Sequence, residues 1–70
     1  MWQLQSIIFE KKYWDENDAE KWLSERGFKT FCDEKEHFWR YRQIEPVRGA
    51  HYMTIKRMKH MLYVMMDNTK

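Results

Sequence analysis

Two arginines, Arg40 and Arg42, are the side chains of this sequence best suited to binding chemistry. In a strand, residues two apart point to the same face, so both guanidinium groups would lie opposite Trp39 and Tyr41. Basic groups bind phosphates, and aromatic rings stack on nucleic-acid bases. The sequence therefore predicts a candidate nucleic-acid-binding surface, weak and tolerant of base sequence, in the basic second half of the chain: Arg40, Arg42, Arg48, Lys56, Arg57, Lys59 and Tyr63.

A structural role for the two arginines is favoured over this binding role. Each could pair with a carboxylate of the same domain, such as Glu10 or Glu45, and so hydrate the sheet surface. The formal net charge of the chain is only +2, which is low for a nucleic-acid-binding protein. Residues 1–36 carry a balance of −3 and residues 37–70 a balance of +5, so the positive charge is concentrated late in the sequence.

Methionines form the second group of candidate binding residues, because a flexible thioether side chain adapts to the shape of a protein partner. The candidate protein-binding residues are Met58, Met61, Met65 and Met66. For any single one of them, a place in the core is favoured. A chain this short cannot easily bury its six Met, four Trp, four Tyr and four Phe residues, so we expect some exposed apolar surface and a protein partner.

No combination of residues in the sequence predicts catalysis or a bound cofactor. Asp33, Glu34 and Glu36 could hold a hard cation, but a solvated turn explains this cluster at least as well. Cys32 lacks the paired cysteine or histidine spacing of zinc sites and is expected to be a small buried apolar residue. We therefore expect no enzyme activity, no metal and no cofactor.

Length and cysteine content limit the class of protein. Seventy residues suit a single domain that covers residues 1–70. The single cysteine leaves no intrachain disulfide and favours a reducing compartment. The apolar start has no basic residue before it, which argues against a signal peptide, and no run approaches the ~20 apolar residues of a membrane span. We therefore expect no membrane partner.

Local patterns outline the elements that would position these residues. A helix is predicted over residues 16–26, with Asp15 as its N-cap and Gly27 as its stop. Its apolar stripe consists of Ala19, Trp22 and Leu23. Strands are predicted over three segments, with the charged residues 33–36 as a turn: residues 4–9, 28–32 and 37–44.

The last third of the chain fits two structures. Residues 52–57 and 61–66 each alternate as strands, with residues 58–60 as the turn between them. The apolar residues also recur at three- and four-residue steps, which is typical of a basic amphipathic helix: Ile55, Met58, Leu62 and Met65. Periodicity alone does not separate the hairpin from the helix.

A set of motifs spaced along the chain favours the hairpin through a resemblance. These motifs are Ser6-Ile7-Ile8-Phe9, Trp14, Ala19, Trp22-Leu23, Gly27-Phe28-Lys29, Asp33, Phe38-Trp39-Arg40-Tyr41-Arg42-Gln43, Pro46, Thr54-Ile55-Lys56 and residues 61–66. Together they resemble a small bacteriophage module found in and beside head-maturation protease sequences. The resemblance implies a viral origin, a β-α-β-β-β order and a hairpin over residues 52–66, but no reaction. The turn at residues 58–60 departs from the module because it lacks the usual glycine.

The sequence thus predicts an α+β fold, a small antiparallel-rich sheet with one helix packed on one face in the order β-α-β-β-β. Its expected core consists of Trp22, Leu23, Phe28, Trp39 and Tyr41. The expected function is that of a non-enzymatic viral accessory module in the host cytoplasm or the virion. It would bind a capsid-assembly component, its own copy or a host factor, with nucleic-acid binding as the alternative.

Overall fold

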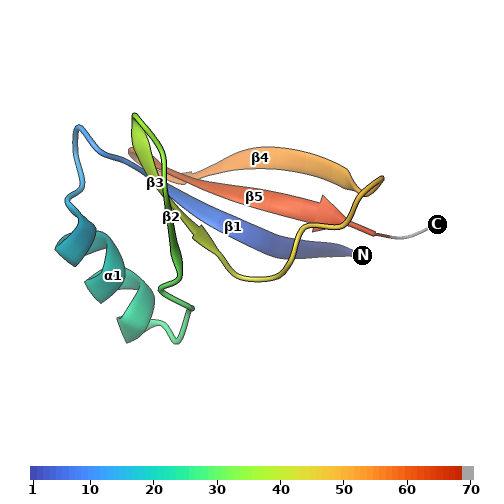
Figure 1. Cartoon of the computed structure of the whole chain (residues 1–70), viewed down its shortest axis with the longest axis horizontal. Coiled ribbons are helices and arrows are strands. Elements are labelled where there is room, and N and C mark those ends of the chain that lie inside the picture. Colours follow the sequence, from blue (N-terminus) through green and yellow to red (C-terminus); the bar gives the residue numbers. More distant parts are fainter. Residues whose placement is uncertain (69–70) are drawn as a thin grey trace.

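The computed structural model describes residues 1–68, which form one helix and one five-stranded sheet (Figure 1). The elements are β1 (Trp2–Glu10), α1 (Glu16–Glu25), β2 (Cys32–Glu34), β3 (Phe38–Arg42), β4 (His51–Met58) and β5 (Met61–Asp67). The strand order across the sheet is β2-β3-β1-β5-β4, and every neighbouring pair is antiparallel. The α+β class is confirmed. The predicted order of a strand, a helix and then strands is followed, with five strands in total.

The helix begins and ends at the residues that local signals indicate. The Asp15 carboxylate accepts a hydrogen bond of 2.7 Å from the backbone N–H of Asp18, which satisfies one of the unpaired donors of the first turn. The helix ends at Glu25, one residue before the predicted end, and Gly27 has a φ of 75°. Glycine adopts this left-handed conformation without the steric cost of a Cβ atom, so the chain can reverse here.

The core is built around Phe9 and Tyr41. The Phe9 ring contacts the rings of Trp14, Trp22 and Tyr41 edge-on, with centroid distances of 4.8, 5.9 and 5.7 Å. The fully buried cluster consists of Ile7, Phe9, Ala19, Leu23, Tyr41 and Met61, so α1 contributes two side chains and the sheet four. Among the predicted core residues, Leu23 and Tyr41 are central, whereas Trp22, Phe28 and Trp39 are partly buried at the border of the cluster.

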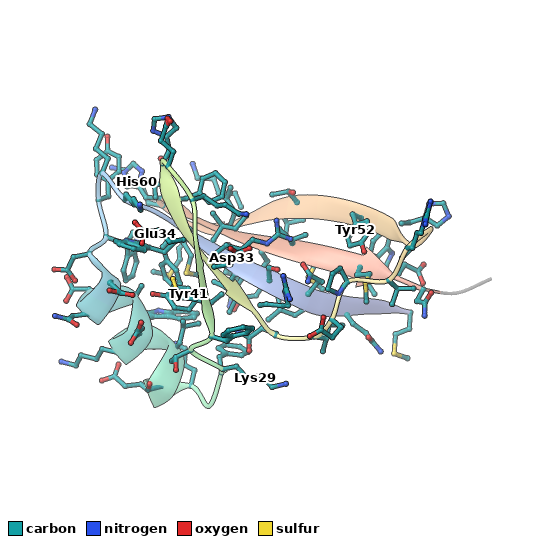
Figure 2. All side chains as sticks on the ribbon, in the orientation of Figure 1. Lys29, Asp33, Glu34, Tyr41, Tyr52 and His60 are labelled. Carbon is teal, nitrogen blue, oxygen red and sulfur yellow. The ribbon has the colours of Figure 1, made fainter. Side chains whose placement is uncertain are left out.

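Residues 51–67 form the predicted β4–β5 hairpin rather than an amphipathic helix. His60 takes the place of the usual turn glycine and has a positive φ of 63°. Its ring stacks on Tyr13 at a centroid distance of 3.4 Å, and its Nδ1 lies 3.4 Å from a carboxylate oxygen of Glu10 (Figure 2). These side-chain contacts offset the cost of a left-handed conformation at a residue that has a Cβ atom.

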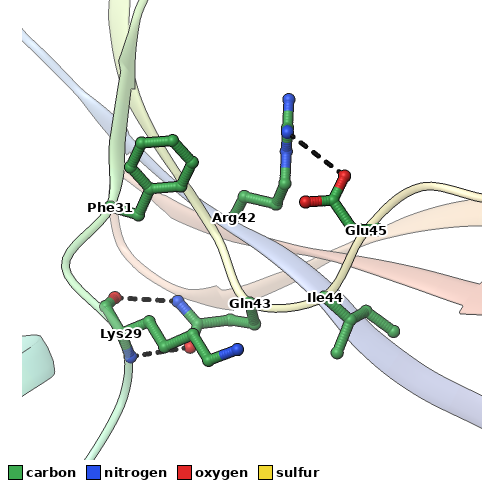
Figure 3. A pocket seen from close by; sticks show the side chains of 6 residues that line it. All are labelled: Lys29, Phe31, Arg42, Gln43, Ile44 and Glu45. Atoms are coloured by element: carbon green, nitrogen blue, oxygen red, sulfur yellow. Dashed lines mark hydrogen bonds and ion pairs between the residues drawn. The ribbon is translucent and has the colours of Figure 1, made fainter.

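The prediction of a strand over residues 28–32 is wrong, because β2 starts only at Cys32 and extends into the predicted turn. The side chain of Gln43 takes the place of a strand pairing at Lys29, whereas the Phe31 carbonyl oxygen accepts a backbone hydrogen bond from Arg42. The Gln43 Nε2 donates to the carbonyl oxygen of Lys29 at 2.9 Å, and the Gln43 Oε1 accepts from the Lys29 N–H at 2.8 Å (Figure 3). One glutamine amide thus satisfies both backbone groups of Lys29 without the hydrogen-bond ladder of a paired strand.

Replacement of Gln43 with glutamate should therefore destabilise the fold by about 1–2 kcal/mol, because a carboxylate cannot donate to a carbonyl oxygen. Urea denaturation measures this difference in the free energy of unfolding. Gln3→Glu is the matched control, since Gln3 is exposed and the change in charge is the same. Equal midpoints for the two variants would show that the Gln43 amide does not hold Lys29.

Candidate functional site

Strand β4 is an edge of the sheet and is the most exposed element of the molecule. It pairs only with β5, and all eight of its residues are exposed. Within residues 1–68, no hydrogen bond outside the strand ladder involves its backbone groups. In an antiparallel sheet, every second residue of an edge strand points its N–H and C=O groups away from the sheet. β4 therefore presents unused backbone donors and acceptors to solvent.

The two faces of β4 differ in chemistry, and the register identifies the apolar one. Ile55 pairs with Tyr63, and Tyr63 pairs with Ile7, a member of the buried cluster that contains α1 side chains. Met53 pairs with Met65, two residues after Tyr63, and therefore points to the same face. The apolar side of β4 thus continues the apolar core across the sheet.

A β-bulge at Gln5 extends this face into the start of β1. The register shifts between Leu4 and Ser6, so Leu4 pairs with Met65 and lies on the same face as Ile7, three residues away. We call the surface formed by these side chains and Trp2 the open face: Trp2, Leu4, Met53, Ile55, Tyr63 and Met65. Trp2, Met53 and Ile55 are each 40–41% exposed. Figure 1 shows the reason, since α1 lies at one end of the sheet and β4 extends beyond it.

The opposite face carries a polar network that includes Arg40. The Arg40 guanidinium donates to Ser6 Oγ at 3.1 Å and to Gln5 Oε1 at 2.9 Å, and Ser6 Oγ also donates to Gln5 Oε1. The Gln5 amide donates to the carbonyl oxygen of Ile44 at 3.0 Å. Because Gln5 and Ser6 are fully buried, they need these partners. Arg40 therefore has a structural role, with partners other than the predicted carboxylates.

The structure does not bring the predicted nucleic-acid-binding residues together on one surface. Arg42 lies on the face of Arg40 and pairs with Glu45 at 3.6 Å, one of the two carboxylates expected for this role. Lys56 lies on that face too, but β1 and β5 separate it from β3, a distance of about 14 Å for three strand spacings. Tyr63 lies on the open face. Arg48 is in the loop before β4, and Lys59 is in the hairpin turn.

The prediction of a methionine patch is wrong for two of its four residues. Met61 is 0% exposed because it pairs with Phe9 in the core. Met66 is 2% exposed and pairs with Tyr52. The Tyr52 hydroxyl accepts a hydrogen bond from the Val47 N–H at 3.0 Å and donates one to the Val47 carbonyl oxygen at 2.9 Å (Figure 2). The loop before β4 is thereby held over the Met66 side of the sheet. Met58 and Met65 remain accessible to a partner, as do Met53 and Ile55, which the prediction left out.

Cys32 is poorly suited to nucleophilic chemistry. Burial raises the pKa of its thiol, and the carboxylates of Glu16, Glu20 and Glu34 raise it further, against a hydrogen bond with Tyr41 that lowers it. Burial also raises the pKa of the Tyr41 hydroxyl. A thiol with a raised pKa is mostly protonated at neutral pH and reacts slowly.

Other features of the described part of the chain are modest. A shallow hollow of about 100 Å³ lies beside Phe31 and Gln43 (Figure 3), well below the roughly 300 Å³ of small-molecule sites. Residues 1–68 contain no group of three side chains placed to hold a metal ion. In the same residues, the only helix is too short to cross a bilayer.

The thiol of Cys32 should titrate above the value of a free cysteine, about 8.5, when its reaction with a disulfide reagent is followed against pH. Because deprotonation is disfavoured in the folded state, the rate should still rise at pH 9. The same protein in urea provides the control, since there the thiol is solvated. A plateau at or below pH 8 in the folded protein would contradict the raised pKa.

Comparison with known proteins identifies no relative: no family model, no curated protein and no solved structure matches this chain. The resemblance to a bacteriophage module remains a prediction.

Proposed function

We propose that this chain is a non-enzymatic accessory module that acts by binding another protein through the open face and the outer edge of β4. The observation that supports this function best is the continuity of the open face with the core. Its apolar side chains form a connected surface across β1, β5 and β4. In this proposal α1 is packed on the same face, over its Phe9 end, and the open face is the part that the helix leaves uncovered.

Exposed apolar surface of this kind favours association. Removal of apolar area from water contributes about 25 cal/mol per Å², and connected apolar patches on small proteins are commonly binding sites. The adjacent β4 edge adds backbone hydrogen bonds, which give a partner orientation as well as affinity. Methionine side chains on the open face adapt to a partner with little strain.

The partner in this proposal is a protein of a viral setting. The phage-module resemblance indicates a capsid-assembly component, a second copy of the chain or a host factor, encountered in the host cytoplasm or in the virion. Nucleic-acid binding has less support, because Arg40 and Arg42 are engaged with Gln5, Ser6 and Glu45.

Replacement of Ile55 with aspartate should reduce partner capture by tenfold or more, because a charge would be desolvated in an apolar interface. Thr54→Asp is the matched control: the neighbouring residue is exposed, changes charge equally and points to the other face of β4. The measurement is affinity capture from expressing cells with wild-type and both variant baits, combined with sedimentation to detect self-association. Thermal unfolding checks that both variants fold.

The ratio between the amounts of partner captured by the two variants decides the test. Loss with Ile55→Asp alone supports the open face as the binding surface. Equal capture by the Ile55 and Thr54 variants would rule it out, whatever protein is captured.

A further inference from the structure

Charge is distributed unevenly along the edge that β4 offers to a partner. Lys56, Arg57 and Lys59 lie at the end of β4 and in the turn that follows it. Among residues 1–68, no carboxylate lies within 4.0 Å of any of these three basic groups. The guanidinium of Arg57 instead lies 5.9 Å from the ring centre of Tyr63, on the open face.

Most acidic residues lie elsewhere in the fold, although Glu10 contacts His60 in the hairpin turn and Asp67 pairs with His51 at the start of β4. Glu16, Asp18, Glu20 and Glu25 belong to α1, and Asp33 and Glu34 belong to β2, the opposite edge of the sheet. The carboxylates of β2 are paired with Lys35 and Lys11, whereas the basic groups at the end of β4 have no carboxylate partner within residues 1–68. A partner strand that carries acidic side chains would complement these basic groups.

We propose that the outer edge of β4 binds an extended acidic segment of a partner protein as a sixth, antiparallel strand of the sheet; this inference rests on the proposed function and names the chemistry of its partner. Antiparallel pairing places the first residues of the segment beside Lys56 and Lys59, so in this proposal the first residues of the segment are acidic. The following residues alternate, and every second side chain is apolar and lies beside Ile55 and Met53 on the open face.

A second copy of this chain fits the edge less well. Antiparallel pairing of β4 with β4 of another molecule would place the basic end of each strand beside His51, Tyr52 and Met53 of the other, where β4 has no carboxylate to complement it. Pairing of β4 with β2 of another molecule is limited by the three-residue length of β2. Its carboxylates are also engaged, Asp33 with Lys35 at 3.3 Å and Glu34 with Lys11 at 2.7 Å.

A synthetic peptide tests the proposal directly. The probe is a fluorescein-labelled peptide of three glutamates followed by alternating isoleucine and threonine, titrated with the whole chain at low salt and followed by fluorescence anisotropy. Saturable binding is expected, and replacement of the glutamates with glutamines should weaken it by about tenfold, since each exposed ion pair contributes modestly. Equal affinity of both peptides, or no saturable binding of the acidic one, would overturn the acidic specificity.

Backbone methylation of the peptide tests strand addition without a change in the protein. Two peptides carry N-methyl groups on alternate residues, one set in each phase of the strand. Because only one phase points its N–H groups at β4, one peptide should lose binding and the other should keep it. Similar affinities for both peptides would exclude a sixth strand.

Protein variants locate the charge contact. Lys56→Glu combined with Lys59→Glu should weaken binding of the acidic peptide by more than tenfold. Lys21→Glu combined with Lys29→Glu changes the net charge equally and should leave the affinity for the peptide nearly unchanged. Equal effects of both pairs would overturn the assigned edge. The proposed function is judged separately by the Ile55→Asp capture ratio. If partner capture depends on Ile55 but the acidic peptide does not bind, only this inference is refuted. A dimer that is detected by sedimentation and abolished by Ile55→Asp would likewise refute only this inference.

Discussion

The short helix is the constraint from which the surface of this molecule follows. Ten residues of α-helix span about 15 Å, whereas the nine residues of β1 span about 30 Å. The helix side chains Ala19 and Leu23 reach the cluster around Phe9 and Tyr41, and no second helix is present in residues 1–68 to cover the remainder. The sheet is therefore longer than the helix, and in the proposed arrangement the open face is the part of the sheet that α1 leaves uncovered.

The bulge at Gln5 allows one strand to serve both faces of this sheet. In a regular strand without the bulge, Leu4 and Ile7 would lie on opposite faces because they are three residues apart, and Leu4 would point away from the open face. The bulge instead directs Gln5 and Ser6 to the other face, where they are fully buried. Arg40 and the Ile44 carbonyl satisfy these buried polar groups. An arginine that resembles a binding residue in the sequence is thus required for the geometry of the sheet.

Features set by neighbouring residues could be predicted from the sequence, and features set by distant pairing could not. Asp15 and Gly27 delimit the helix through contacts within a few residues. The β4–β5 hairpin is local too, but its residue pattern fits a helix equally well, and only the module resemblance favoured the hairpin. The placement of β1 between β3 and β5 is not local, and it decides that Met61 is buried while Met53 is exposed. For the same reason, the sequence did not separate Tyr63 from Arg40 and Arg42. The Gln43 bond to Lys29 replaces a strand pairing that β-propensity alone predicts.

An exposed edge strand also carries a risk, because its free backbone groups can pair with any other strand and cause aggregation. Proteins commonly limit this risk with lysines, charged residues and bulges at the edge, and β4 has all three at its end, in Lys56, Arg57 and the register shift between Lys56 and Met58. These features disfavour pairing with a basic or neutral strand and leave the start of β4, with Met53, free to pair. The positive charges that protect the edge from self-association therefore also determine which partner it favours. Protection and specificity at this edge have the same physical origin, and removal of the charges would weaken both.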